Sequence, residues 1–184
     1  MKKRVLTLLL VACSVFLCAC GGGTSTGNND NTENVGNTGN TNTGNETAKD
    51  KSYIFTCDGI EISVNDDIEV VIDKLGEPLA YFEAASCAFE GLDKFYTYSS
   101  FQLDTYPKNG KDMLASIYFK DDLVKTTEGI SLYMTKADMI AAYGEATSVN
   151  GTEYIYEKGN GCLKFIIEDD EIVSIEYKTK VEYN

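Results

Sequence analysis

Residues 163–177 read Leu-Lys-Phe-Ile-Ile-Glu-Asp-Asp-Glu-Ile-Val-Ser-Ile-Glu-Tyr, and this stretch decides the predicted fold. Apolar residues alternate with polar ones on both sides of a short acidic segment, residues 168–171. Alternation with a period of two is typical of a strand with one buried face, and acidic residues between two such runs favour a turn. The stretch therefore predicts an antiparallel hairpin with one solvated face.

Two further runs of the same kind lie upstream. Phe101 and Leu103 alternate with polar residues, as do Ala115, Ile117 and Phe119. We expect these residues on a covered face of a sheet, together with Leu163, Phe165, Ile167, Val173, Ile175 and Tyr177. The opposite, solvated face is expected to carry Ser116, Tyr118, Lys164, Ser174 and Glu176. The runs predict an antiparallel sheet with one covered and one open face.

Two short amphipathic helices are also predicted. The first has an apolar stripe at positions i, i+3, i+4 and i+7, formed by Ile68, Val71, Ile72 and Leu75. Asn65 or Asp66 would cap its start, and Gly76 would end it. The second helix would begin at Thr135-Lys136-Ala137-Asp138, which has capping-box spacing, and stop at Gly144. Helices this short need a sheet to pack against.

Short segments recur in the same order in the two halves of the chain. The matched pairs are residues 58–62 with 128–132, 75–78 with 143–146, 96–98 with 154–156, and 114–120 with 172–178. Ordered self-similarity indicates an internal duplication. We therefore predict an α+β fold in which two tandem helix-plus-antiparallel-strand repeats, residues 53–123 and 124–184, form one globular domain. The helices are expected to pack on one face of an antiparallel sheet.

The first 19 residues have the pattern of a signal peptide. A basic start is followed by an apolar stretch, residues 5–17, that is too short to span a bilayer as a mature helix. The segment closes with Leu17-Cys18-Ala19-Cys20, which resembles the lipobox of bacterial lipoproteins. That resemblance implies cleavage before Cys20 and a diacylglyceryl group on its thiol. An ordinary secretory signal that releases a free protein is the alternative.

Residues 20–52 are expected to form a flexible tether behind the lipidated Cys20. They consist largely of Gly, Asn and Thr without periodic apolar residues. Such a composition cannot bury enough surface to offset its ordering entropy. We expect an end-to-end distance of about 30 Å for a tether of this length. The lipid would then hold the domain at the extracytoplasmic face of the bacterial cell membrane.

The chain is strongly acidic. It has 16 Lys and Arg against 29 Asp and Glu, which gives a formal net charge of −13. Lys2, Lys3 and Arg4 would leave with the signal peptide, so the mature chain would be more acidic still. Nucleic acid is not expected as a partner, because binding to phosphate backbones requires a positive patch. Anionic membrane surfaces would also repel the chain, so its predicted membrane contact depends on the lipid.

The absence of histidine from the sequence excludes several kinds of active site. Ser-His-Asp and Cys-His nucleophiles and the His-Glu-x-x-His metal site are ruled out, and the sequence has neither a Ser-x-x-Lys pattern nor a glycine-rich phosphate loop. We therefore expect no catalytic residue, no enzymatic activity and no cofactor. A pair among the many carboxylates leaves a carboxylate-based cell-wall hydrolase as an alternative.

Metal binding is not expected either. Asp121-Asp122 and residues 168–171 are acidic enough for calcium, but both lie where strands end and lack EF-hand spacing, so turns are the simpler interpretation. Cys57, Cys87 and Cys162 are far apart and have no histidine to complete a zinc site. In an exported domain these cysteines predict one disulfide and one free thiol. The spacing does not fix the pairing, and we favour Cys57 with Cys87.

Tyrosines are the remaining candidate binding residues. The tyrosines at matching positions of the two halves are Tyr96, Tyr98, Tyr154 and Tyr156. Tyr118 is expected on the open face, because its neighbours Ile117 and Phe119 face the core. Aromatic side chains on an open sheet provide contact area at low entropic cost, which favours a recognition surface. The alternative is that tyrosine simply suits half-buried strands.

The order of elements, with a short helical segment ending in Leu75-Gly76-Glu77-Pro78, resembles a group of secreted domains. That group includes beta-lactamase inhibitory protein and the small lipoproteins of outer-membrane assembly. Residues 75–78, 86–91 with 96–98, and 127–130 are similar to uncharacterised lipoproteins of Gram-positive anaerobes. The first resemblance implies a fold and allows an inhibitor, and the second implies a location. Neither transfers an inhibitory or assembly residue to this chain.

These observations predict a surface-tethered lipoprotein that acts as a non-catalytic binding or structural module. Its expected partner is an extracytoplasmic protein or a cell-wall component, contacted through the open sheet face. An inhibitor of an extracytoplasmic enzyme is the first alternative, and the carboxylate-based cell-wall hydrolase is the second.

Overall fold

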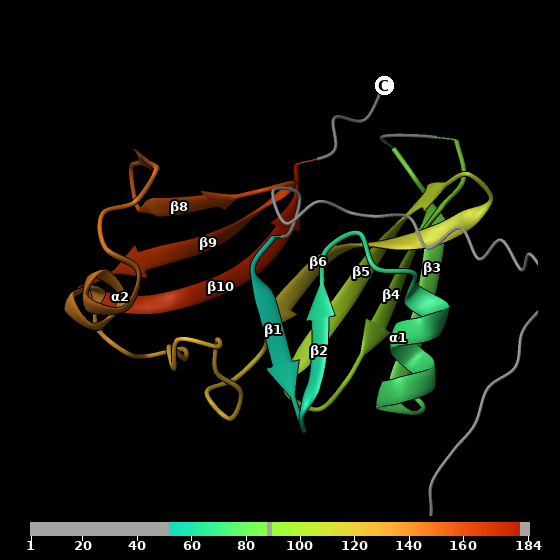
Figure 1. Ribbon diagram of the computed structural model, residues 1–184, viewed down its shortest axis with the longest axis horizontal. Helices are drawn as coiled ribbons and strands as arrows, with labels where there is room; N and C mark the ends of the chain where they lie inside the picture. The colour runs from blue at the N-terminus through green and yellow to red at the C-terminus, as the bar shows by residue number, and fades with distance from the viewer. Residues whose placement is uncertain (1–51, 88–89, 181–184) are drawn as a thin grey trace, which may run out of the picture. The chain divides into compact units, whose positions relative to one another are not determined.

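The computed structural model describes residues 52–87 and 90–180 (Figure 1). The predicted signal peptide, the predicted lipidation site Cys20 and residues 20–51 of the predicted tether lie outside the described residues. Within the described part of the chain, no helix is both long enough and apolar enough to cross a membrane. The lipid anchor and the location therefore stay predictions.

The described residues form ten strands and two helices. Strands β1 (Ile54–Cys57) and β2 (Ile60–Ser63) pair with each other as an antiparallel hairpin. The helices are α1 (Ile68–Leu75) and α2 (Lys136–Tyr143). The remaining strands are β3 (Ala80–Ala85), β4 (Leu92–Thr97), β5 (Phe101–Lys108), β6 (Lys111–Phe119), β7 (Ser148–Asn150), β8 (Glu153–Lys158), β9 (Gly161–Glu168) and β10 (Glu171–Thr179). These eight strands form one antiparallel sheet in the order β3-β4-β5-β6-β10-β9-β8-β7.

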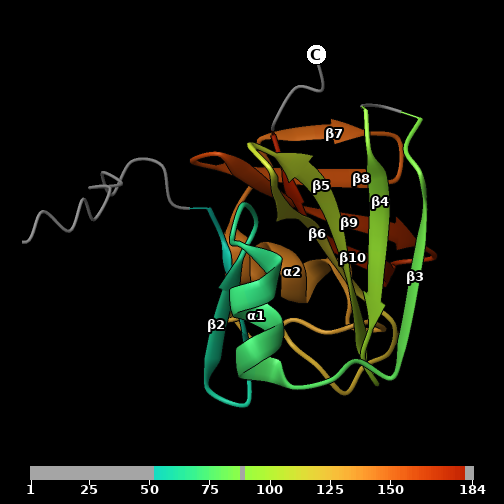
Figure 2. The same ribbon diagram turned by 90° about the vertical axis from the view of Figure 1, so that its right-hand side faces the viewer.

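The sheet consists of two meanders, β3 to β6 and β7 to β10, which meet where β6 pairs with β10. This contact is centred on Ile117 opposite Tyr177. Away from the contact, each central strand is bridged to the chain just before a helix, β6 through Asp67 and β10 through Thr135. The two meanders run in different directions (Figure 2), so the sheet is strongly twisted.

The β1–β2 hairpin and both helices lie on one face of this sheet (Figures 1 and 2). Phe55 of β1 is fully buried, and its ring centre lies 5.1 Å from those of Phe101 and Phe119 and 6.0 Å from that of Tyr177. The hairpin therefore fills the middle of the hydrophobic core, and burial of its aromatic ring stabilises the contact with the central strands. Among the described residues, no element covers the other face of the sheet.

Both helices begin and end close to the predicted positions, with one change of cap. The side chain of Asp67, rather than that of Asn65 or Asp66, accepts the hydrogen bond from the first turn of α1. In α2 the predicted capping box is present, because Thr135 and Asp138 accept reciprocal backbone hydrogen bonds. Each helix ends at a glycine with positive φ, which a residue with a Cβ adopts only with strain.

Two β-bulges change which residues face the core. The pairing of β10 with β9 shifts between Ile172 and Ser174, and the pairing of β5 with β6 shifts beyond Asp104. As a result Ile172 is fully buried, whereas Val173 is only partly buried. The predicted position of Val173 on the covered face was wrong, because a bulge adds one residue to a pattern of period two.

The predicted fold class was also wrong. The structure is mostly β, with one large antiparallel sheet, and does not consist of two tandem helix-plus-strand repeats whose helices pack on a sheet. The two helices have eight residues each, and the middle of the core is filled by the β1–β2 hairpin instead. Residues 128–132 resemble the hairpin residues 58–62 in sequence but form turns and irregular chain. Similar sequence segments therefore have different local structures in the two halves, so the segment matches do not show that the whole structural unit is repeated.

Candidate functional site

Two of the five predicted binding tyrosines are core residues. Tyr98 and Tyr156 are only 9% and 3% exposed. The Tyr98 hydroxyl donates to the carbonyl oxygen of Gly76 at 2.9 Å, and the Tyr156 hydroxyl donates to that of Gly144 at 3.0 Å. Tyr98, just after β4, and Tyr156, on β8, therefore each connect the sheet to the end of a helix, where backbone carbonyls lack a helical partner. These two candidate binding residues are therefore not presented at the surface, because the hydroxyl of each buried tyrosine has a hydrogen-bond partner inside the protein.

The other three tyrosines do not share one surface. Tyr96 and Tyr154 are partly buried on the face that carries the helices. The Lys136 ammonium lies 4.8 Å from the centre of the Tyr154 ring, a cation–π contact. Tyr118 is on the uncovered face, as predicted, and is 40% exposed. The structure therefore does not bring the five tyrosines together as one binding face.

The uncovered face carries a network of charged side chains. Lys164 lies between two carboxylates, with its Nζ 2.5 Å from Glu153 Oε1 and 3.9 Å from Glu176 Oε2. The Nζ of Lys178 is 3.7 Å from the other carboxylate oxygen of Glu176. These residues come from three neighbouring strands and largely compensate one another's charge. The network stabilises the face rather than offering a single charge to a ligand.

Asp104 lies in the same face, nearer to β4. Gln102 Nε2 donates to its Oδ1 at 2.7 Å, and Ser116 Oγ donates to its Oδ2 at 3.1 Å. Burial raises the pKa of the Asp104 carboxyl, and the negative charge of Glu176 adds to the increase. Ser116 was predicted to be solvated, but it is buried, and its hydroxyl donates a hydrogen bond to the Asp104 carboxylate.

Strand β3 forms one edge of the sheet. Three large apolar side chains are exposed close together on this strand and on the residue before it. Leu79, Tyr81 and Phe82 are 75%, 48% and 63% exposed. Every residue of β3 except Ala84 is exposed. Large apolar side chains that gather in one exposed place commonly mark an interaction surface. We call residues 79–85 the β3 edge.

Two aromatic pairs fix the side chains of the β3 edge against β4. The Phe82 ring stacks on Phe95 with ring centres 5.9 Å apart. The ring centres of Tyr81 and Tyr96 are 5.0 Å apart, on the face that carries the helices. Because successive side chains of a strand point to opposite faces, each face of the sheet has one aromatic anchor at this edge. The anchors are ordered by contacts within the sheet before any partner arrives.

The backbone of β3 has a free side. Ser86 N donates to Gly91 O just beyond Ala85, so the N–H and C=O groups of Ala85 point away from β4. The same applies to every second residue before it, which are Glu83 and Tyr81. Among the described residues, no strand pairs with this side of β3. The edge therefore presents a row of hydrogen-bonding groups beside its aromatic anchors.

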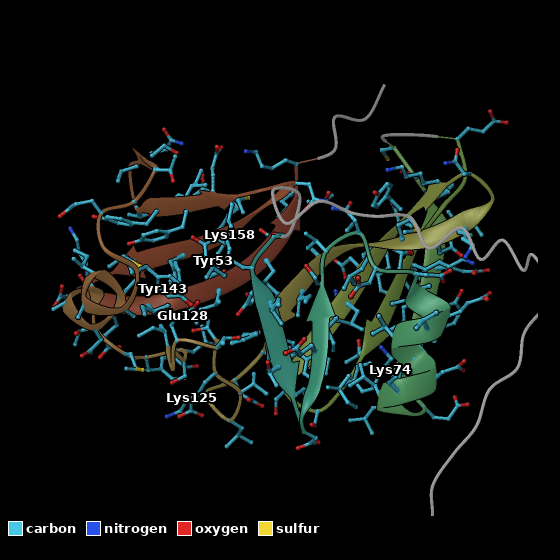
Figure 3. The ribbon with its side chains drawn as sticks, in the orientation of Figure 1. Tyr53, Lys74, Lys125, Glu128, Tyr143 and Lys158 are labelled. Carbon is cyan, nitrogen blue, oxygen red and sulfur yellow. The ribbon has the colours of Figure 1, made fainter. Side chains whose placement is uncertain are left out.

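A separate polar cluster lies where the start of β1, the end of β8 and α2 meet (Figure 3). The Tyr143 hydroxyl donates to Glu128 Oε2 at 2.5 Å, and the Lys158 ammonium lies 5.1 Å from the centre of the Tyr53 ring. Burial, and after it the contact with Glu128, raises the pKa of the Tyr143 hydroxyl, which keeps it a donor. The ring centres of Tyr53 and Tyr143 are 6.0 Å apart. We assign this cluster a structural role, because its contacts fasten the start of β1 to α2.

The acidic segments predicted as turns have the geometry of turns. Glu168 pairs with Glu171 across the β9–β10 connection, and Asp169 and Asp170 have positive φ values of 48° and 69°. Asp tolerates this conformation better than most residues do. Asp121 accepts a hydrogen bond from the backbone of Leu123 at 3.0 Å. In the described ranges, no three Asp, Glu, Cys or His side chains are grouped as they would be around a metal ion.

All three cysteines of the domain are free thiols, so the Cys57–Cys87 disulfide that we favoured is not present in the structure. Cys57 lies on β1 of the two-stranded sheet, whereas Cys87 lies just beyond the end of β3 in the large sheet. Cys162 lies on β9 and is partly buried. Burial raises the pKa of the Cys57 and Cys162 thiols, whereas Cys87 is exposed.

No family model matches this chain, and no curated protein matches it. A solved structure of a cysteine-rich secretory protein from Staphylococcus aureus is similar with a TM-score of 0.44 and 14% identity. That match covers 64% of this chain but only 44% of the other. A DUF4309 family protein from Bacillus subtilis is similar with a TM-score of 0.38 and 16% identity, over 62% of this chain and 79% of the other. Neither likeness assigns a family or a function.

Two hollows lie away from the β3 edge. One, of about 620 Å³, is bounded by the β1–β2 hairpin, residues 63–66, Lys74 and Asn160. The other, of about 540 Å³, adjoins Cys57 and residues 123–127. In the first, two unpartnered side-chain atoms, Asn65 Nδ2 and Asn160 Oδ1, are buried from solvent, so they are not presented to a ligand. We therefore place the candidate site at the β3 edge.

Sequence reasoning missed this edge. The sequence of β3, Ala-Tyr-Phe-Glu-Ala-Ala, has no alternation and no long apolar run. The usable signals were Pro78, which cannot continue a helix, and the two adjacent aromatic residues, which favour a strand. These signals indicate a strand, but its place at the edge of the sheet depends on the tertiary fold.

Proposed function

We propose that this protein is a non-catalytic binding module that captures an extended polypeptide segment as an additional strand along β3. The observation that carries the proposal is the combination, in one six-residue strand, of a free backbone side and exposed aromatic anchors. Peptide recognition by strand addition uses these two features, because backbone hydrogen bonds give affinity and side-chain contacts give specificity.

The opposite edge of the same sheet supports this assignment by contrast. Strand β7 has only three residues, and Val149 is the one large apolar side chain on it. Natural sheets commonly protect their edges by making the edge strand short or charged. The β7 edge follows that rule, whereas the β3 edge has six residues and a single charged one, Glu83. A partner that pairs with β3 accounts for this difference.

The partner would be extracytoplasmic if the chain is delivered as its N-terminus predicts. Lipid on Cys20 and a tether of about 30 Å would let the domain sample proteins and peptides near the membrane surface. The test is a Cys20→Ser substitution in the full chain followed by cell fractionation. We expect the variant to leave the membrane fraction. Membrane retention equal to that of the unchanged chain would contradict the anchor, while leaving strand capture to be judged by its own experiment.

Strand capture is tested with a displayed library of random peptides about ten residues long, enough to pair with all of β3. The full-length protein is compared with a Phe82→Lys variant and with a matched Val149→Lys variant on the other edge. Peptides selected on the unchanged protein should bind Phe82→Lys at least about tenfold more weakly, because the substitution removes an anchor. Val149→Lys should leave binding unchanged.

Hydrogen exchange supplies an independent readout of the same complex. A bound strand should slow exchange of the outward-facing amides of Tyr81, Glu83 and Ala85, since these amides gain acceptors. Exchange at β7 should not change. Equal loss of binding in the two lysine variants, or a bound peptide that leaves the three β3 amides unprotected, would refute the proposal.

A further inference from the structure

We infer that the captured segment is a cationic strand in which apolar residues alternate with Lys or Arg. Its apolar side chains would lie on the uncovered face of the sheet beside Phe82, and its basic side chains would lie on the other face beside Glu83. This inference rests on the proposed capture of a strand by β3 and specifies which polypeptides the edge accepts.

The uncovered side of the β3 edge suits apolar side chains. Ala80, Phe82 and Ala84 point to this face, because they alternate with Tyr81 and Glu83. The Phe82 ring stands between two alanines, so space remains along the strand on both sides of it. Side chains of an added strand would lie directly opposite and diagonal to that ring, within contact distance of an aromatic group.

The other side of the edge suits cations. Glu83 accepts a hydrogen bond from the Tyr81 hydroxyl. The lysine nearest to Glu83 across the ladder is Lys94, but its ammonium is bound to Asp112 with an Nζ to Oδ2 distance of 2.7 Å. Lys94 therefore interacts more strongly with Asp112 than with Glu83, and the Glu83 carboxylate is exposed beside the free backbone side of the strand. A basic side chain on an added strand would meet that carboxylate as a cross-strand pair.

The surrounding charge favours the same partner. Exposed Glu77 and Glu90 lie close in sequence to the two ends of β3, and the chain as a whole has a formal net charge of −13. A surface of one sign attracts a ligand of the opposite sign and speeds its association. A second copy of this chain, paired through its own β3, would bring two strongly negative molecules and two Glu83 carboxylates together. We therefore commit to a cationic segment of another polypeptide.

The test uses three synthetic peptides of equal length and fluorescence anisotropy with the full-length protein. One peptide alternates Val with Lys, the second has the same composition in two blocks, and the third alternates Val with Ser. The protein variants are Glu83→Gln and Phe82→Ala, with Asp73→Asn on an exposed position of α1 as the matched charge control. All titrations are run at low and at high salt.

We expect the alternating Val and Lys peptide to bind most tightly. Glu83→Gln should weaken it about fivefold at low salt and should leave the Val and Ser peptide unchanged, because one cross-strand ion pair is lost. Phe82→Ala should weaken both alternating peptides to a similar degree. Asp73→Asn should change neither.

The outcomes separate the two levels of the proposal. If the Val and Ser peptide binds as tightly as the Val and Lys peptide and Phe82→Ala weakens both, the cationic partner is refuted while strand capture stands. If the block peptide binds as well as the alternating one and Phe82→Ala has no effect, strand capture itself fails. Sedimentation of the protein alone tests whether a second copy of the chain pairs with β3 instead. A dimer that the Phe82→Lys substitution dissociates would refute the cationic partner in favour of that second copy.

Discussion

Removal of one hydroxyl group from Tyr98 or from Tyr156 should destabilise the fold by a similar amount at each site. Each hydroxyl donates to the carbonyl of the glycine that ends a helix, Gly76 or Gly144. A Tyr→Phe substitution removes this hydrogen bond but keeps the ring and its packing. The two substitutions, Tyr98→Phe and Tyr156→Phe, therefore test the same kind of hydrogen bond at two places in one protein.

The expected magnitude follows from the environment of the acceptor. An intramolecular hydrogen bond contributes about 0.5–1.5 kcal/mol net to the free energy of unfolding. Gly76 and Gly144 are exposed, so water can hydrate the carbonyl that loses its partner, and each substitution should cost about 1 kcal/mol, the middle of that range. The two sites belong to different helices and share no contact partner in these bonds, so the double variant should lose about 2 kcal/mol.

Urea denaturation of the full-length protein provides the assay. With a slope of about 2 kcal/mol per molar urea, each single substitution should lower the midpoint by about 0.5 M. Tyr118→Phe is the control, because this exposed hydroxyl lies on the uncovered face and its loss should leave the midpoint almost unchanged. If Tyr98→Phe and Tyr156→Phe behave like Tyr118→Phe, the structural role that we assign to these two tyrosines is wrong.

Three further predictions concern the core, the uncovered face and the thiols. Phe55→Ala should lower the free energy of unfolding by about 3–5 kcal/mol in the same assay, because the ring is fully buried; a loss under 1 kcal/mol would contradict the packing. Because burial raises the pKa of the Asp104 carboxyl in the folded state, its protonated form contributes stability that is lost as the pH rises through that pKa. The free energy of unfolding of Asp104→Asn relative to the unchanged protein should therefore increase between about pH 3 and pH 7, and a constant difference would oppose this assignment. In alkylation followed by mass mapping, Cys87 should react fastest because it is exposed, and faster reaction at Cys162 would contradict its burial.

The helices and the central strands could be predicted because each has one face in the core. The stripe that ends at Leu75 and the alternation that surrounds Phe165 are consequences of that burial, so the period of the apolar residues reports it directly. The capping box at Thr135 is equally local, since all its partners lie within four residues. Local patterns therefore identified both helices and the four central strands β5, β6, β9 and β10.

The architecture could not be predicted, because it depends on contacts between distant parts of the chain. Residues near Ile60 form a hairpin that lies in the centre of the core, whereas the similar residues near Ile130 do not form a strand. The bulge that buries Ile172 in place of Val173 shifts the register without a visible signal in the composition. The burial of Tyr98 and Tyr156 could not be predicted for the same reason, because the glycine carbonyls that accept from their hydroxyls are brought close only by the tertiary fold.

The acidic composition and the open β3 edge are related physically. A long, apolar edge strand invites pairing with any copy of itself, and proteins ordinarily prevent this by shortening or charging the strand. In this chain β3 keeps its length and its exposed aromatics, while the net charge of −13 makes copies repel one another. Repulsion of that kind rejects partners by sign rather than by shape, so it blocks acidic copies and leaves the backbone groups of Tyr81, Glu83 and Ala85 accessible to a basic strand. A neutral chain with the same edge would lack this selectivity, which is why we connect the charge of the whole molecule with the specificity of one strand.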